Sequence, residues 1–251
     1  DGNSNNLSYT IALSRNNTYT NPIFPLGGSE FVISARFSLP YSLWNGIDYA
    51  NLAELEKYQD DDGNPDPAKI EQEKFRWLEF YKVKFKGSWY TRLFDKLVLR
   101  THTEFGFLGA FNNDRGVIPF DRFFLGGDGM SQYAMDGRET ISLRGYPNQS
   151  LSTQDGSTIY NRFSLELRYP ITLKPAASIF GLTFLETGQG YNSFREFNPF
   201  NGKRSLGLGL RIFMPAFGLL GIDFGYGLDA VNDFDLTPNG WETHFVIGQQ
   251  F

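Results

Sequence analysis

The chain contains no cysteine, and only two histidines and three methionines, among its 251 residues. Without cysteine it can build neither a disulfide scaffold nor a thiolate zinc site, and it has no thiol nucleophile. The two histidines, His102 and His244, each lack a second histidine nearby in the sequence, which argues against a histidine metal site. We therefore expect neither a metal nor another cofactor.

Long apolar runs and basic clusters are also missing. No run reaches the roughly 18 apolar residues of a membrane-spanning helix, although strands that cross a membrane give a much weaker hydropathy signal and are not excluded. The net charge is -5 at pH 7, and no cluster of lysine and arginine stands out. These features argue against a nucleic-acid partner.

The chain is rich in aromatic residues (17%) and in glycine (27 residues), and its apolar residues recur with a period of two. Strict alternation over eight or more residues is typical of a β-strand with one apolar and one polar face. Nine such strands are predicted: Asn6–Ser14, Ser29–Leu39, Phe75–Tyr90, Lys96–Ala110, Tyr160–Tyr169, Ser178–Thr187, Arg204–Met214, Phe217–Asp229 and Trp241–Phe251.

The two faces of these strands do not by themselves distinguish the two all-β classes. A soluble β-sandwich turns its apolar faces inward, whereas a membrane barrel turns them toward lipid. For a barrel, the residues predicted to face lipid are Leu165, Leu167, Leu208, Leu210, Ile222 and Phe224, and the charges predicted to face inward are Arg162, Arg168, Arg211 and Asp223.

The lengths of the connections favour the barrel. After the first one, short connections (Thr91–Asp95, Ile171–Pro175, Pro215–Ala216) alternate with long ones (Pro40–Lys74, Phe111–Ile159, Gln189–Lys203, Ala230–Gly240). Outer-membrane barrels combine short periplasmic turns with longer extracellular loops, and a strand of about 10 residues spans a bilayer when tilted. The predicted fold is an all-β transmembrane antiparallel β-barrel, with a soluble sandwich as the alternative.

Six segments, in this order along the chain, carry a resemblance to a known family. They are RNNTYTNPIFPLGG (Arg15–Gly28), PFDRFFLGG (Pro119–Gly127), SLRGY (Ser142–Tyr146), SLELRYP (Ser164–Pro170), FLETG (Phe184–Gly188) and FVIGQQF (Phe245–Phe251). Together they resemble the C-terminal portion of the barrel domain of the bacterial surface antigen family. One difference is the segment Asp128–Ser142, which is longer than is usual in the family.

The resemblance implies a sixteen-stranded barrel of which residues 1–251 carry the last nine strands. An unclosed sheet would leave unpaired backbone groups in lipid, so we expect the other strands, and N-terminal POTRA domains, outside this chain. The long loop Phe111–Ile159 is expected to fold back into the lumen. Its Arg144-Gly145-Tyr146 motif would bring Arg144 to the lumenal partners Glu166 and Glu186, since a buried guanidinium needs carboxylates.

The last predicted strand is expected to form a lateral gate with the first strand of the barrel. Its members are Trp241, Phe245, Ile247, Gly248 and Phe251. Two explanations are open for Gly248: a kink at the seam between the strands, or a small residue in a crowded lumen.

The implied function is the insertion and folding of β-barrel proteins into the bacterial cell outer membrane. Its partners would be unfolded outer-membrane proteins, accessory periplasmic or lipoprotein subunits of an assembly complex, and outer-membrane lipid. The alternative is a polypeptide-exporting or passive channel of the same superfamily. No Gly-x-Ser-x-Gly elbow or evident triad appears, so no enzyme is predicted.

The acidic segment Asp60–Glu71 has oxygen ligands at several positions of a calcium-binding loop. However, Pro65 stands where such a loop requires glycine. We interpret the segment as a polar turn in an external loop.

Overall fold

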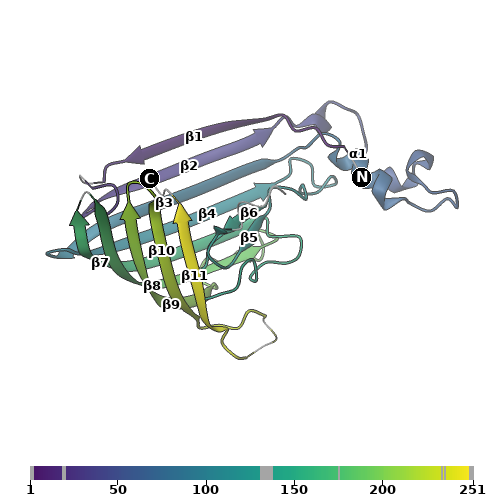
Figure 1. Ribbon diagram of the computed structural model, residues 1–251. Helices are drawn as coiled ribbons and strands as arrows, with labels where there is room; N and C mark the ends of the chain where they lie inside the picture. The colour runs from purple at the N-terminus through teal and green to yellow at the C-terminus, as the bar shows by residue number, and fades with distance from the viewer. Residues whose placement is uncertain are drawn as a thin grey trace.

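The computed structural model describes residues 3–18, 21–130, 138–174, 176–232, 234 and 236–248, and within them its main element is one antiparallel sheet of nine strands (Figure 1). The strands pair in the order β1-β2-β3-β4-β7-β8-β9-β10-β11. Their bounds are β1 Ser8–Asn16, β2 Gly28–Ser38, β3 Tyr81–Phe94, β4 Leu97–Gly109, β7 Ile159–Lys174, β8 Ala177–Tyr191, β9 Lys203–Met214, β10 Gly218–Gly227 and β11 Gly240–Gly248. The number of strands and their antiparallel order match the barrel prediction.

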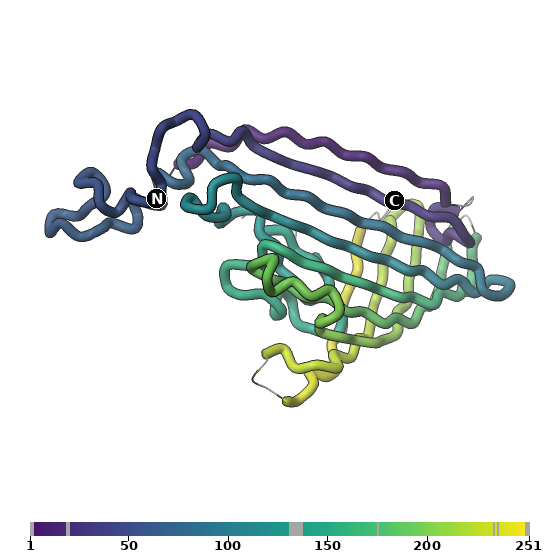
Figure 2. Tube along the Cα trace, turned by 180° about the vertical axis from the view of Figure 1, so that it is seen from behind, coloured from purple at the N-terminus to yellow at the C-terminus, as the bar shows by residue number. Residues whose placement is uncertain are grey.

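The sheet curves like a section of a barrel wall, so that β1 and β11 form its two edges (Figures 1 and 2). The long connection from β4 to β7 lies on one side of it and contains two short parallel strands, β5 (Phe123–Leu125) and β6 (Glu139–Ile141). Because this connection covers the polar face of the sheet, we call that face the inner face.

The outer face of the sheet is apolar and uncovered. Leu165, Leu167, Leu208 and Phe224 are exposed, and Leu210 and Ile222 are half-exposed. Arg162, Arg211 and Asp223 are buried on the opposite face, with Arg168 half-buried beside them. An apolar exposed face is the arrangement of a membrane barrel, so the predicted facing is confirmed and the soluble sandwich is wrong.

The core lies between the inner face and the segments that cover it. Its main cluster joins Phe123, Leu125, Leu143 and Tyr146 of the long loop to wall residues such as Tyr160. A second cluster lies at the end of the sheet with the short turns. There Phe24, from the connection between β1 and β2, packs edge-on against Phe180 with ring centroids 5.2 Å apart. The apolar interior therefore holds loop segments against the wall.

The external connection between β2 and β3 has its own local structure. It contains three short 3-10 helices, Tyr41–Leu43, Leu52–Glu54 and Glu56–Tyr58, and one α-helix, α1 (Pro67–Phe75). The Asp66 carboxylate accepts hydrogen bonds from the backbone N–H groups of Ala68 and Lys69, and Pro67 follows it at the first helical position. None of the helices in the described part of the chain is long and apolar enough to span a membrane.

Several predicted boundaries need correction. The strand expected from Phe75 begins only at Tyr81, because the cap at Asp66 makes residues 67–75 helical. β3 also continues to Phe94, and β7 continues to Lys174 through a β-bulge after Pro170, where the missing N–H of proline does least harm to the ladder. The turns predicted at Thr91–Asp95 and Ile171–Pro175 are therefore mostly strand.

Candidate functional site

A network of charged side chains lies where the tip of the long loop meets the inner face of the sheet. Arg144 is 5% exposed, and its Nη2 lies 2.7 Å from Glu166 Oε1 on β7 and 2.6 Å from Glu186 Oε1 on β8. Its Nη1 lies 3.4 Å from Asp223 Oδ2 on β10. The guanidinium also lies 3.7 Å from the centre of the Phe184 ring, which is cation–π distance.

The carboxylates around Arg144 do not depend on it for a counterion. Each also pairs with an arginine of the sheet: Arg168 with Glu166 at 2.5 Å, Arg162 with Glu186 at 2.6 Å, and Arg211 with Asp223 at 2.7 Å. The wall is thus a ladder of alternating charges that exists without the loop. Arg144 inserts into it as one additional cation, at a place where three carboxylates converge.

The backbone of Gly145 packs tightly against the wall. A Cβ built on Gly225 of β10 would lie 2.6 Å from the Gly145 nitrogen, and one on Gly145 would lie 2.9 Å from the Gly227 nitrogen. Gly145 also has φ +87°, a conformation that favours glycine. The glycines of β10 therefore make room for the loop, which accounts for the Gly-x-Gly pair inside a strand.

The backbone polar groups of Gly145 both have side-chain partners at the C-terminal end of the sheet. Its N–H donates to Nε2 of His244 on β11 at 2.8 Å. Its carbonyl accepts a hydrogen bond of 2.9 Å from Nδ2 of Asn239, the residue immediately before β11.

Tyr146 completes the motif at the external end of the wall. Its ring is fully buried, and its hydroxyl donates to the Arg204 carbonyl at 2.7 Å and accepts from the Asp229 N–H at 3.3 Å. Burial raises the pKa of this hydroxyl to about 12, so it remains a donor throughout the physiological range. The three residues of the motif thus contact all of the strands from β7 to β11 or the segments that flank them.

A second charged contact holds another part of the same loop. Lys82 of β3 lies 2.7 Å from Oε2 of Glu139 on β6, and Lys84 lies 2.9 Å from the other oxygen of that carboxylate. Lys82 also donates to the Asp121 carbonyl at 2.6 Å, and Arg36 of β2 pairs with the Asp121 carboxylate at 3.2 Å. The charges are reversed relative to the Arg144 site, since here the wall is cationic and the loop is anionic.

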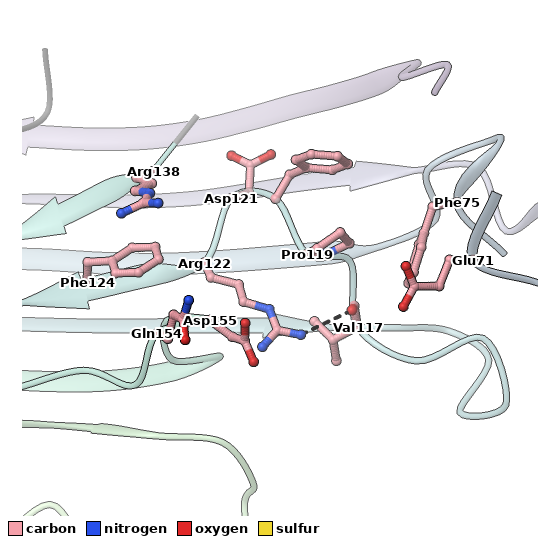
Figure 3. Close-up of a pocket in the computed structure, with 11 residues that line it drawn as sticks. Glu71, Phe75, Val117, Pro119, Asp121, Arg122, Phe124, Arg138, Gln154 and Asp155 are labelled. Atoms are coloured by element: carbon pink, nitrogen blue, oxygen red, sulfur yellow. Dashed lines mark hydrogen bonds between the residues drawn. The ribbon is translucent and has the colours of Figure 1, made fainter. Parts of the chain in front are cut away.

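A cavity of about 460 Å3 lies between the same loop and α1 (Figure 3). Its lining has both signs of charge, including Glu71, Asp155 and Arg138. Arg122 folds back toward its own loop and donates to the carbonyls of Ile118 at 3.1 Å and Val117 at 3.4 Å. We assign this arginine a role in shaping the loop.

A serine, a histidine and a glutamate meet on neighbouring strands, although no triad was evident in the sequence. Ser88 Oγ lies 2.8 Å from His102 Nδ1, and His102 Nε2 lies 2.7 Å from Glu104 Oε1. Arg100 Nη2 lies 3.1 Å from the Ser88 hydroxyl and 3.2 Å from His102 Nδ1, so it competes for the lone pair that a general base would use. Glu104 also pairs with Arg162 at 3.1 Å, which joins the group to the charge ladder.

Four of the five predicted gate residues lie on β11, which pairs with β10 along Leu219–Gly227. Trp241, Phe245 and Ile247 are exposed on the outer face. Gly248 ends the strand with φ +156°, and a Cβ there would meet none of the described residues within 4 Å. Both explanations of this glycine stay predictions. Phe251 lies outside the described residues.

The segment Asp60–Glu71 forms a tight turn that leads into α1. The Asp60 carboxylate accepts the N–H groups of Asp62 at 3.0 Å and Asn64 at 2.8 Å, and the Asn64 N–H is the leading cause of its lowered pKa. Among the described residues, no group of three or more histidine or acidic side chains is arranged to hold a metal ion.

Sequence reasoning found Arg144, Glu166 and Glu186 but missed other residues that join the loop to the wall, among them Asp223, His244 and Glu139. Asp223 was predicted to face inward, yet only the curvature of the sheet brings β10 within reach of Arg144. Nothing in the sequence pointed to a role for His244 except that it is one of only two histidines. Glu139 lies in the long segment Asp128–Ser142, whose length was the only indication of an additional contact.

Comparisons with known proteins agree with this architecture. A family model described as Omp85 superfamily domain matches residues 1–251. The fold is similar to the crystal structure of BamA from Haemophilus ducreyi lacking POTRA domains 1-3, with a TM-score of 0.61 and 19% sequence identity. The similarity covers 95% of this chain and 41% of that one, so the chain spans less than half of the length of that structure. No curated protein matches the chain in sequence.

Proposed function

The chain belongs to the Omp85 superfamily and forms part of a β-barrel of the bacterial outer membrane, and on this premise we propose that it belongs to a protein that inserts and folds other β-barrel proteins there. Similarity in fold to BamA supports this proposal, as does the loop motif seated on the inner wall. The proposed barrel has sixteen strands, with this chain supplying the last nine.

The observation that carries the proposal is the position of the seated loop relative to β11. The loop motif is bonded to the strands up to and including β11, while the far edge of β11 has no partner strand among the described residues. In a closed barrel this edge would meet the first strand, and the junction would be the seam. The loop thus supports the last strand from inside without covering its pairing edge.

The proposed mechanism uses that edge as a template. When the seam opens, the backbone N–H and C=O groups of β11 lie in lipid without partners, at a cost on the order of several kcal/mol each. A strand of a client protein can satisfy them by β-augmentation. A short seam would also thin the nearby bilayer and lower the barrier to insertion. Accessory subunits would deliver unfolded clients to this edge.

A disulfide across the seam tests the mechanism. In the full-length protein, a cysteine on the outer face of β11, such as Thr243→Cys, would be cross-linked to the first strand of the barrel. We expect the oxidised protein to stop inserting client barrels into liposomes and the reduced protein to resume. A matched control joins Thr243→Cys to Phe224→Cys, its direct neighbour on β10, and should leave insertion intact.

Continued insertion through the locked seam would overturn the gate mechanism. It would favour the alternative candidate, a channel that exports polypeptides through the lumen. The observation that supports this candidate is the charged lining of the inner face. Export through the lumen, unlike insertion at the seam, should survive the cross-link and fall when the loop is tethered to the wall.

A further inference from the structure

Three segments that are distant in sequence meet at Gly145: the long loop, Asn239 and the last strand. The Gly145 N–H donates to His244 Nε2 at 2.8 Å and its carbonyl accepts from Asn239 at 2.9 Å. His244 is 4% exposed, so the bond is made away from bulk solvent. A buried N–H without an acceptor is destabilising, and the imidazole is the acceptor that this N–H has.

The bond fixes the protonation state of the imidazole. A backbone N–H can only donate, so Nε2 must present its lone pair and the single ring proton must be on Nδ1. A doubly protonated imidazolium has no acceptor and would meet the Gly145 N–H as donor against donor. The other histidine differs, because His102 Nε2 faces the Glu104 carboxylate and Nδ1 faces the donors Ser88 and Arg100. The two histidines therefore hold opposite tautomers.

Charged groups near the imidazole influence whether it takes up a second proton. Asp223 lies directly across from His244 on β10, and Glu242 precedes it on the same face of β11. Asp128 and Arg144 of the long loop supply the remaining charges that act on the ring. Asp223 is itself paired with Arg211 of β9 at 2.7 Å, so charges of both signs act on a ring that must stay neutral to hold the loop.

We propose that His244, with Asn239, is a positioning residue that ties the last strand to the seated loop, and that the tie holds only while the imidazole is neutral. The inference rests on the proposed function, in which β11 borders the seam. The hydrogen bond between Gly145 and His244 would then couple the seating of the loop to the position of that strand. Protonation of His244 would release Gly145 from β11 without breaking the ion pairs of Arg144 with β7 and β8.

The first test determines which ring nitrogen of His244 carries the proton, in the full-length protein in lipid bilayers. Solid-state NMR of the histidine-labelled protein, assigned with His244→Gln and His102→Gln variants, should show His244 with its proton on Nδ1 and His102 with its proton on Nε2. A His244 signal with the proton on Nε2 would overturn the proposal.

The second test measures the consequence for the loop and for client insertion between about pH 4.5 and pH 8. The range extends below the ordinary titration range of histidine because burial and the Gly145 N–H both favour the neutral ring. In the wild type, cleavage of residues 111–158 by added protease should accelerate as the pH falls, and client insertion should slow. His244→Gln offers a neutral acceptor at every pH, so its loop cleavage should be independent of pH. His244→Phe offers none, and its loop should be cleaved about tenfold faster than that of the wild type even at pH 8.

The control is His102→Gln, which should retain the pH response of the wild type. An unchanged response in His244→Gln, or a fully protected loop in His244→Phe, would overturn the tie. Absence of client insertion in the wild type would instead count against the proposed function. The NMR and cleavage measurements would still show whether His244 holds the loop.

Discussion

At the scale of single residues, Arg144 carries a positive charge into a site whose carboxylates already have arginine partners on the sheet. Arg162, Arg168 and Arg211 each lie within 2.7 Å of one of them. The wall should therefore keep its structure when Arg144 is removed. What the loop loses is its charge-assisted hydrogen bonds and its contact with the Phe184 ring.

We predict that Arg144→Ala leaves the strands folded but weakens the seating of the loop by about 1.5–3 kcal/mol, the range for hydrogen bonds to charged groups. Hydrogen exchange of residues 138–146 should rise while that of β7 and β8 does not, and client insertion should fall. Arg144→Lys should recover little, since one ammonium cannot reproduce the planar fork that reaches three carboxylates. Equal loop protection in Arg144→Ala and wild type would contradict the assigned role.

At the scale of elements, the strands and the residues that share each face were predictable because alternation is a local property. Which face meets lipid followed instead from the lengths of the connections. The boundaries failed where another local signal competed, as at Phe75, where the Asp66 cap and Pro67 start a helix inside the predicted strand region. The length of β7 was underestimated because Pro170 suggests an end, whereas a β-bulge carries the strand past it.

The contacts between the loop and the wall were only partly predictable. Glu166 and Glu186 follow from the resemblance, and strand parity supports Glu166 directly. Asp223, His244 and Lys82 become partners only through the curvature of the sheet and the path of a long loop, which no local pattern records. The pairing of β5 with β6 likewise depends on two segments that are separated by Gly126–Arg138.

The contact between β6 and β3 gives a prediction with a pH dependence. Although burial alone would raise it, the pKa of Glu139 is lowered from its ordinary value of 4.5 by Lys82 and Lys84. A carboxylate with a lowered pKa stabilises the folded loop fully above its unfolded pKa, and this contribution is lost as the pH falls through the lower folded value. We expect Glu139→Gln to accelerate cleavage of the loop at pH 7. Variant and wild type should be cleaved equally fast once the pH has fallen below the folded pKa of Glu139.

A charge exchange tests the specificity of this contact. Glu139→Lys alone should loosen the loop more than Glu139→Gln does, because it places a cation beside Lys82 and Lys84. Combining it with Lys82→Glu should recover part of the protection. Glu196→Gln, which changes an exposed glutamate in the β8–β9 connection, is the matched control. Failure of the double variant to recover any protection would mean that Glu139 acts through packing alone.

At the scale of the whole molecule, the polarity of the sheet is inverted relative to a soluble protein. Charges such as Asp223 and Glu186 are buried under the long loop, whereas leucines are exposed on the outer face. The apolar face can be stable only where lipid replaces water. We expect the long connections to face water instead, so an exposed aromatic there, such as Phe200, should have no lipid to contact.

This contrast predicts opposite outcomes for the same substitution at two exposed apolar positions. Leu208→Arg on the outer face of β9 should cost about 2–4 kcal/mol near the midplane of the bilayer and should reduce the yield of folded, heat-modifiable barrel. Phe200→Arg, at a side chain that is 93% exposed in the β8–β9 connection, should leave the yield unchanged. Both variants add one positive charge and remove one apolar side chain. A difference in their yields of folded barrel therefore shows whether lipid or water surrounds each side chain. If the two variants fold equally well, β9 does not face lipid, and the assignment of the outer face fails with it.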